Sequence, residues 1–321
     1  MYAETYEGIN SFLIGASKLL RKESVRRETR GSVCYELPEP AIFKITNPQA
    51  REVTIHARKW NRTLPYAESL WIASGRNDMA YITHYLPRMM DFSDNGHYMR
   101  GGYGPRYRDY NGEKEDYQIE SINVRQAGSI DQLKYVVECF KADVETRRSV
   151  MSFGDPMKDD FDKEGNLKVT KDIPCTRELH FMKQAGADKL DLIVRMRSND
   201  LIWGASAVNI FNYTFMQEYV AAILGMKVGN YYHIADNLHY YDRHEELVKT
   251  LSEMEGAEEM SVIYDKTFHS LGEFDELVTS LSEEEMSMRK NMSGYKQTVF
   301  EDPFFQHWYE VICDYNKNKR R

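Results

Sequence analysis

Two alternating runs joined by a glycine-containing turn limit most strongly what this chain can fold into. The runs "TRELHFMK" (176–183) and "LDLIVRMRS" (190–198) have the composition and alternation of β-strands, and Gly186 lies between them. The apolar residues of the second run share one face: Leu190, Leu192, Val194 and Met196. Arg195 and Arg197 therefore lie on the other face. The pattern predicts a β-hairpin.

Helical patterns surround this hairpin. "INSFLIGASKLL" predicts a helix, and the basic "RKESVRRETRG" after it an exposed loop. "LPYAESLWIASG" (64–75) has proline in its first turn and a glycine at its end, as a short helix does. "SIDQLKYVVECFKAD" predicts a helix that begins with a capping box of Ser129 and Gln132. "GGYGPRYRDYNG" (101–112) is expected to be a loop.

The second half of the chain adds further helices. "SAVNIFNYTFMQEYVAAILG" is apolar on nearly every side and is expected to be a buried helix that ends at Gly225. The last 80 residues contain two acidic helical patterns and the amphipathic "FFQHWYEVICDYNKNKRR". No repeat or Pro/Gly linker divides the chain, so we expect one domain over residues 1–321.

Composition excludes several classes of function. The formal net charge of −8 disfavours binding to a nucleic-acid backbone, although a few converging arginines can still hold a small anion. No apolar run approaches the roughly 18 residues that span a bilayer, so no membrane role is expected. The four cysteines are far apart and form no CxxC pair, which predicts neither a zinc site nor a disulfide framework. We expect a reducing cytoplasmic setting without metal.

Single residues leave the chemistry open. Cys175, in "IPCTRELHF", is either a buried thiol or a nucleophile kept ionised by nearby arginines. Glu68, one turn from Trp71, is either at the edge of its helix or buried with a raised pKa, and the sequence alone favours the edge. Asn209 and Asn212 in the buried helix need partners for their amides, which backbone or a ligand can supply.

The order of these motifs is more specific than any one of them. Glu68 in "AESLWIASG", the paired arginines in "DQLKYVVECFKADVETRRSVMSF", "PC" at 174–175, "RSNDLIWGASAVNIFNY" and "HYY" at 239–241 follow one another. Over roughly residues 60–245 this arrangement resembles the thymidylate synthase family. The resemblance implies an α+β fold, with a mixed β-sheet packed with helices and dimers that form sheet to sheet.

The resemblance also implies roles for individual residues. Cys175 would be the nucleophile that adds to C6 of a pyrimidine, and Glu68 would order water and relay protons. The nucleotide would be held by a larger set: Arg30, Arg147, Arg148, Arg197, Ser198, Asn209, His239 and Tyr241. Arg147 and Arg148 would reach the phosphate in the neighbouring subunit of a homodimer. Asp200 would lie near the folate and take part in catalysis, and Tyr107 would stand at the place of a shielding tryptophan.

These residue types suit one-carbon transfer to a pyrimidine nucleoside monophosphate. C5 of a pyrimidine is a poor nucleophile until a thiolate adds at C6. Arginines both lower a cysteine's pKa and neutralise a phosphate. The co-substrate that the resemblance implies is 5,10-methylenetetrahydrofolate.

Several departures from the family pattern bear on the last step of the reaction. Thr176 follows the cysteine where the synthases have histidine, Tyr107 replaces the tryptophan, and "SFGD" replaces "SAWN". One residue more than usual separates Gly204 from Asn209, and the chain ends in "KNKRR", not in a short apolar tail. A missing apolar lid and a lost indole favour water over hydride at that step.

We therefore expect a nucleotide 5-hydroxymethylase that acts on deoxycytidylate or cytidylate. A thymidylate synthase that acts on deoxyuridylate is the main alternative, and a catalytically silent nucleotide-binding relative is a third. A thiol hydrolase is disfavoured, because the family pattern places no histidine as its base. An asparagine amide can match the 4-amino or the 4-oxo edge, so Asn209 leaves the base open.

Overall fold

A six-stranded mixed sheet forms the centre of the computed structural model, which describes residues 1–29, 31–118 and 125–319. Its strands, in spatial order, are β1 (Tyr2–Tyr6), β4 (Ala41–Ile45), β9 (Lys227–Ala235), β7 (Lys189–Met196), β6 (Thr176–Lys183) and β5 (Val150–Ser152). Strand β7 pairs antiparallel with β6 and parallel with β9, which confirms the expected hairpin. The turn between β6 and β7 contains Gly186 at φ 74°, a conformation that favours glycine.

A smaller four-stranded sheet stands beside the first. Its strands, in order, are β2 (Val25–Thr29), β3 (Ser32–Glu36), β10 (Leu238–Tyr241) and β8 (Asn199–Asp200). Strand β2 occupies part of the basic segment that was expected to be a loop, so that expectation was wrong. All five residues of β2 are exposed, and pairing with β3 rather than burial makes them a strand.

Ten α-helices are found in the described part of the chain: α1 (Ile9–Glu23), α2 (Thr63–Ala73), α3 (Met79–Tyr85), α4 (Tyr103–Arg108), α5 (Gln132–Ala142), α6 (Pro156–Asp159), α7 (Ile210–Ile223), α8 (Glu245–Ser252), α9 (Leu271–Asn291) and α10 (Pro303–Asn318). Short 3-10 helices are η1 (His56–Arg58), η2 (Pro87–Phe92), η4 (Asp242–His244) and η5 (Met292–Gly294), and η3 (Leu201–Asn209) is a π-helix. The mixture of helices with two mixed sheets confirms the α+β class.

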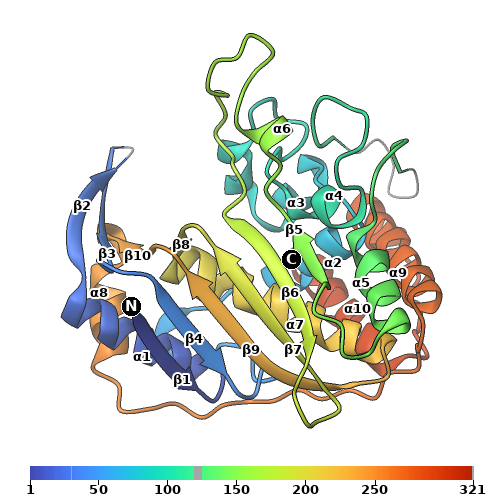
Figure 1. Cartoon of the computed structure of the whole chain (residues 1–321). Helices are drawn as coiled ribbons and strands as arrows, with labels where there is room; N and C mark the ends of the chain where they lie inside the picture. Colours follow the sequence, from blue (N-terminus) through green and yellow to red (C-terminus); the bar gives the residue numbers. More distant parts are fainter. Residues whose placement is uncertain (30, 119–124, 320–321) are drawn as a thin grey trace.

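The core lies between the large sheet and the helices behind it. Leu192 and Val194 on β7 are completely buried, as the alternation predicts, and Tyr231 on the neighbouring β9 is also completely buried. Helix α7 packs on this face, and every residue but one of its 14 is buried, which confirms the helix that is apolar on all sides. Figure 1 shows α7 and α2 behind the strands, while no helix covers the face toward the viewer.

Two local expectations fail for identifiable reasons. The cap of α5 is Asp131, whose carboxylate accepts bonds from the amides of Leu133 and Lys134, and not the expected capping box at Ser129. The segment 101–112, expected to be a loop, contains α4. A Cβ at Gly104 would lie 2.1 Å from the carbonyl oxygen of Arg76, so this helix depends on a close backbone approach that only glycine permits.

Buried ion pairs attach α4 to the segment that leads to β6. Arg106 is 0% exposed, and its guanidinium donates to both carboxylate oxygens of Asp159 at 2.7 and 2.8 Å. Arg100 donates to the same carboxylate at 3.1 Å. Burial alone would raise the pKa of Asp159, but the hydrogen bonds and charge of Arg106 outweigh it and lower that pKa. Asp159 is therefore the carboxylate partner of the completely buried Arg106, and Arg100 is shared between Asp159 and Asp116.

We predict that Asp159→Ala destabilises the fold by about 3–5 kcal/mol, because the buried guanidinium of Arg106 loses its carboxylate partner and that of Arg100 loses one of two. Chemical denaturation at neutral pH measures this loss. The exposed neighbouring carboxylate provides a matched control, and Asp160→Ala should change the unfolding free energy by less than about 0.5 kcal/mol. Equal effects of the two substitutions would contradict a structural role for the buried pair. The difference should narrow as pH falls toward the lowered pKa of Asp159, where its contribution is lost.

Candidate active site

The thiol of Cys175 lies at the start of β6, where the chain is held by the end of β7. Of the four cysteines, three are buried and Cys175 alone is partly exposed. The amide of Arg197 donates to the carbonyl of Cys175 at 2.9 Å. The guanidinium of Arg197 donates to the carbonyls of Pro174 at 3.1 Å and Ile173 at 3.0 Å. Arg197 thus fixes the segment that contains the thiol, and Nη1, for which no acceptor is found among the described residues, leaves a donor for an anion.

Two residues that sequence reasoning missed lie beside this segment. The hydroxyl of Tyr103, on α4, accepts a bond from the amide of Thr176 at 3.3 Å. Burial raises the pKa of Tyr103, and the charge of Cys175 raises it further, so the phenol remains a neutral hydrogen-bonding group near the thiol. Asp172 accepts a bond from the amide of Gly101 at 2.8 Å, and burial raises its pKa to about 6. In the sequence, the position of Tyr103 directly after Gly101 and Gly102 could have indicated it as a candidate.

Glu68 projects from α2 into the interior and is partly buried. Burial raises the pKa of Glu68 to about 7, and the side chain of Asn212 opposes this shift. The hydroxyl of Tyr213 is hydrogen-bonded to that of Thr176, and the charge of Glu68 acts on the pKa of Tyr213. Glu68 is therefore linked through one buried phenol to Thr176, the residue after Cys175. The preference for the helix edge was wrong, because α7 covers this side of α2.

Asp200 and His239 face each other across two paired strands. Strand β8 runs parallel to β10 with Asp200 opposite His239. One carboxylate oxygen of Asp200 caps the π-helix η3 through the amides of Ile202 at 2.7 Å and Trp203 at 3.0 Å. No hydrogen bond to its other, buried oxygen is found among the described residues. Burial lowers the pKa of His239, and the charge of Asp200 opposes this shift.

The segment before Asn209, where the sequence predicts one additional residue, forms the π-helix η3. A π-helix takes one more residue per turn than an α-helix and often marks a functional site. Asn209 ends η3 and is 6% exposed, and its side-chain oxygen accepts a bond from Asn199 at 2.9 Å. A Cβ at Gly204 would lie 2.5 Å from Asn199 Nδ2 and 2.8 Å from Asn209 Oδ1. Glycine at 204 therefore leaves space for the bonded amides.

The remaining candidates divide into two groups. Ser198 is partly buried directly after Arg197, and the ring of Tyr241 meets that of His239 edge to face at 5.3 Å. Arg147 and Arg148 are exposed, and the carbonyl of Arg147 is bonded to His180, five residues along β6 from Cys175, or roughly 16 Å. The single chain does not bring these two arginines to the thiol.

Tyr107 lies in the core, and Arg30 is not among the described residues. Tyr107 is completely buried and its hydroxyl is bonded to that of Tyr219 at 3.1 Å. The hydroxyl of Tyr107 is therefore paired with another phenol inside the fold. Arg30 lies outside the residues that the structure describes.

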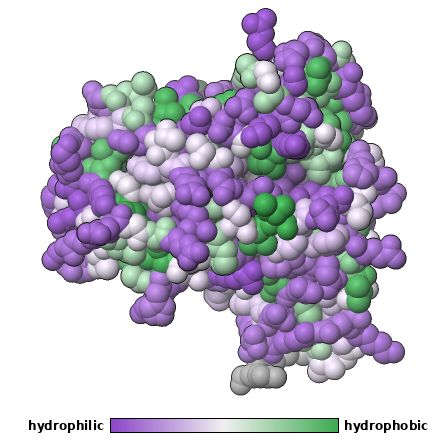
Figure 2. Space-filling model, turned by 90° about the horizontal axis from the view of Figure 1, so that it is seen from below, coloured by the Kyte–Doolittle hydropathy of each residue, from purple (hydrophilic) through white to green (hydrophobic). Residues whose placement is uncertain are grey.

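Other features of the described residues add no second centre. No group of His, Cys, Asp or Glu side chains suited to a metal ion is found in residues 1–29, 31–118 and 125–319. Within these ranges no helix is long and apolar enough to cross a bilayer. Figure 2 shows a mainly hydrophilic surface with scattered hydrophobic residues on the face seen from below.

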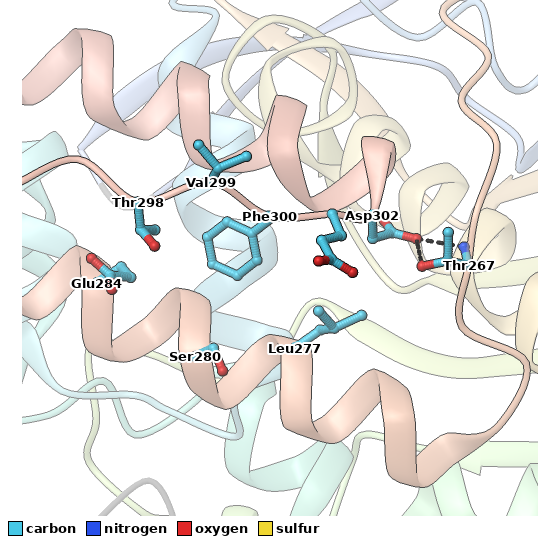
Figure 3. A pocket seen from close by; sticks show the side chains of 9 residues that line it. Thr267, Leu277, Ser280, Glu284, Thr298, Val299, Phe300 and Asp302 are labelled. Atoms are coloured by element: carbon cyan, nitrogen blue, oxygen red, sulfur yellow. Dashed lines mark hydrogen bonds between the residues drawn. The ribbon is translucent and has the colours of Figure 1, made fainter.

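A cavity of about 450 Å³ lies between α9 and the segment that precedes α10 (Figure 3). The polar side chain at its end, Asp302, caps α10 and accepts bonds from Thr267 at 2.6 and 3.0 Å. None of the candidate site residues lines this cavity. Its polar groups serve the fold.

Comparison with known proteins agrees with this geometry. The family model described as "Thymidylate synthase" matches residues 22–293. The chain belongs to the thymidylate synthase family. Two similar family members are deoxyuridylate hydroxymethyltransferases, from Bacillus phage SP01 (37% identical over 66% of this chain and 51% of that protein) and Pseudomonas phage M6 (33% identical over 68% and 56%). A thymidylate synthase from Bacillus licheniformis is 33% identical over 40% of this chain and 42% of that protein.

The length of chain that is matched differs between these relatives. The chain spans about half the length of the curated relatives it matches. The similarity to the phage hydroxymethyltransferases extends over 212 and 221 residues, and that to the Bacillus licheniformis synthase over 129. Within the family, the chain thus shares a longer stretch with these hydroxymethyltransferases.

We predict that Glu68 titrates near pH 7 and that Asn212→Leu moves its pKa higher, because the amide now lowers it. Carbon-13 NMR of labelled glutamate, with Glu68→Gln to assign the signal, measures both values. Thr214→Val is a control on the same helix, since the Thr214 hydroxyl bonds to helix carbonyls. A Glu68 signal that titrates near pH 4 in the unaltered protein would contradict the burial argument.

Proposed function

We propose that this protein 5-hydroxymethylates a pyrimidine nucleoside monophosphate, and that its substrate is deoxyuridylate. The observation that carries the proposal is the carboxyl of Glu68, with a pKa of about 7, one phenol away from the residue that follows Cys175. A group with this pKa exchanges protons with water near neutral pH. Such a group suits a reaction in which water is added beside a covalently held pyrimidine.

In this proposal each site residue has its own role. Cys175 adds to C6 of the pyrimidine, which makes C5 nucleophilic. Arg197 and Ser198 hold the 5′-phosphate, and His239 and Tyr241 contact the sugar. Glu68 orients the water and takes its proton. 5,10-Methylenetetrahydrofolate supplies the one-carbon unit when bound, and the buried oxygen of Asp200 that lacks a partner among the described residues suits a donor on this ligand.

The choice of deoxyuridylate replaces the expectation of deoxycytidylate or cytidylate. The similar phage proteins are named for deoxyuridylate, and they match about two thirds of the chain. The second candidate is reductive methylation of deoxyuridylate, as in the thymidylate synthases that the chain also matches. The two reactions share the thiol addition and differ in whether water or hydride reaches the new carbon.

We predict that incubation with deoxyuridylate and methylenetetrahydrofolate yields the 5-hydroxymethyl nucleotide and tetrahydrofolate. Mass spectrometry identifies the nucleotide, and absorbance distinguishes tetrahydrofolate from dihydrofolate. Glu68→Gln should slow product formation more than it slows tritium release from C5, because it removes the group that activates water. Cys175→Ala should lower turnover at least about a thousandfold, while Cys139→Ala, a buried thiol on α5, should not.

A 5-methyl product formed in step with dihydrofolate would instead establish the synthase reaction. Nucleotide binding without either product, in the presence of folate, would favour the catalytically silent relative.

We also propose that the active form is a homodimer with shared sites. The face of the large sheet opposite α7 has no covering helix in Figure 1. Ile193 on β7 and Tyr232 and Ile234 on β9 are partly exposed on this face. A second copy packed there would bury these side chains, and Arg147 and Arg148 lie exposed beside the strand β5 at one edge of the sheet. In such a dimer the exposed side chains of Arg147 and Arg148 would be available to the nucleotide phosphate bound by the second subunit.

We predict that Arg148→Ala weakens nucleotide binding and that mixing it with Cys175→Ala restores part of the activity. Each hybrid dimer then has one site with both an intact thiol and an intact arginine. Activity across mixing ratios, with hybrid formation checked by native mass spectrometry, measures this effect. Lys141→Ala, an exposed cation on α5, should bind nucleotide as the unaltered protein does. Hybrids that form and regain nothing would contradict shared sites.

A further inference from the structure

A continuous line of four buried side chains leads from the candidate site into the core. Asn199 donates to Asn209 Oδ1 at 2.9 Å, and Asn199 Oδ1 is bonded to His233 Nε2 at 2.8 Å. His233 Nδ1 is bonded to the hydroxyl of Tyr231 at 2.9 Å. The four side chains are 6%, 3%, 0% and 0% exposed in the order Asn209, Asn199, His233, Tyr231. We call this line the amide relay.

The histidine gives the amide relay a direction. Burial lowers the pKa of His233 to about 4, so the ring is neutral at pH 7 and has one donor and one acceptor nitrogen. Asn199 Nδ2 donates to Asn209 Oδ1, which leaves Asn199 Oδ1 to accept from Nε2–H of His233, and Nδ1 must then accept from the hydroxyl of Tyr231. Each proton points toward the site.

The hydrogen bonds of the relay could also all run in the opposite direction, but that arrangement leaves one buried proton without an acceptor. It requires both amides to flip and the histidine proton to move to Nδ1, which would then donate to the hydroxyl of Tyr231. The proton of that hydroxyl would need a new acceptor. Among the described residues, no hydrogen bond of the Tyr231 hydroxyl other than the one to His233 is found. A completely buried hydroxyl proton without an acceptor is unfavourable.

The direction of the relay decides what Asn209 offers to a ligand. With Oδ1 occupied by Asn199, the other end of the Asn209 amide is the donor Nδ2, and no acceptor for it is found among the described residues. A uracil ring presents an oxygen acceptor at position 4, whereas cytosine presents an amino donor there. An amide that donates fits the first and opposes the second.

We propose that Asn199, His233 and Tyr231 are positioning residues that make the site select a 4-oxo pyrimidine over a 4-amino pyrimidine. They act through Asn209 and not by touching the base. Binding cytosine requires the whole relay to reverse, which leaves the Tyr231 hydroxyl proton without an acceptor. The inference rests on the proposed role of Asn209 in the nucleotide site, and it concerns binding of the base, not the product of the reaction.

The experiment measures dissociation constants of deoxyuridylate and deoxycytidylate by calorimetry, without folate, in a Cys175→Ala background. This background should bind deoxyuridylate at least about tenfold more tightly. Asn199→Asp should abolish or reverse the preference, because a carboxylate accepts from both His233 and Asn209 and turns Asn209 Oδ1 toward the base. Tyr231→Phe should reduce the preference several-fold, because either direction then leaves one ring nitrogen unpaired. Tyr85→Phe is the matched control: it removes a buried hydroxyl that donates to Glu285 at 2.8 Å, and it should leave the ratio unchanged.

The outcomes separate the inference from the proposed function. Equal binding of the two nucleotides to the background protein, or an unchanged ratio in both folded variants, would overturn the relay. If neither variant folds, nitrogen-15 NMR of His233 in the unaltered protein decides the matter, because a proton on Nδ1 would contradict the direction. A methyl product with the expected binding ratios would overturn hydroxymethylation and leave the relay standing.

Discussion

The antiparallel pairing of β6 with β7 is the constraint on which the rest of the site depends. It places the start of one strand beside the end of the other, so that Arg197 meets the backbone of residues 173–175 with its amide and its guanidinium. The thiol is thereby held on a rigid strand end rather than on a free loop. Asp200 and Asn209 follow Arg197 closely in the chain, so their positions depend on where Arg197 is held.

Burial of polar groups provides the chemical character of the site. Glu68 and His233 are both shifted toward their neutral forms by burial, but with different consequences. Glu68, with a pKa of about 7, can exchange protons at neutral pH. His233, with a pKa of about 4, is neutral at that pH and is bonded to Tyr231 and Asn199. The same physical effect thus brings one pKa close to neutral pH and moves the other well below it.

An irregular helix positions Asn209. The π-helix η3 ends at Asn209 and holds its side chain beside Asn199. Gly204 leaves the space that the two amides fill. The sequence could not predict this π-helix, because spacing alone does not distinguish a bulge in a helix from a longer loop.

The sequence by itself determined the hairpin of residues 176–198, the buried helix before Gly225 and the order of motifs that indicates the family, because these depend on periodicity and residue type along the chain. It could not determine α4, which depends on Gly104 against the backbone of Arg76, or the pKa of Glu68, which depends on what α7 covers. It also could not determine the orientation of the Asn209 side-chain amide, because either orientation is possible until a hydrogen-bond partner favours one of them. Only the tertiary structure supplied that partner, by bringing Asn199, His233 and Tyr231 from two strands of different sheets into one hydrogen-bonded line.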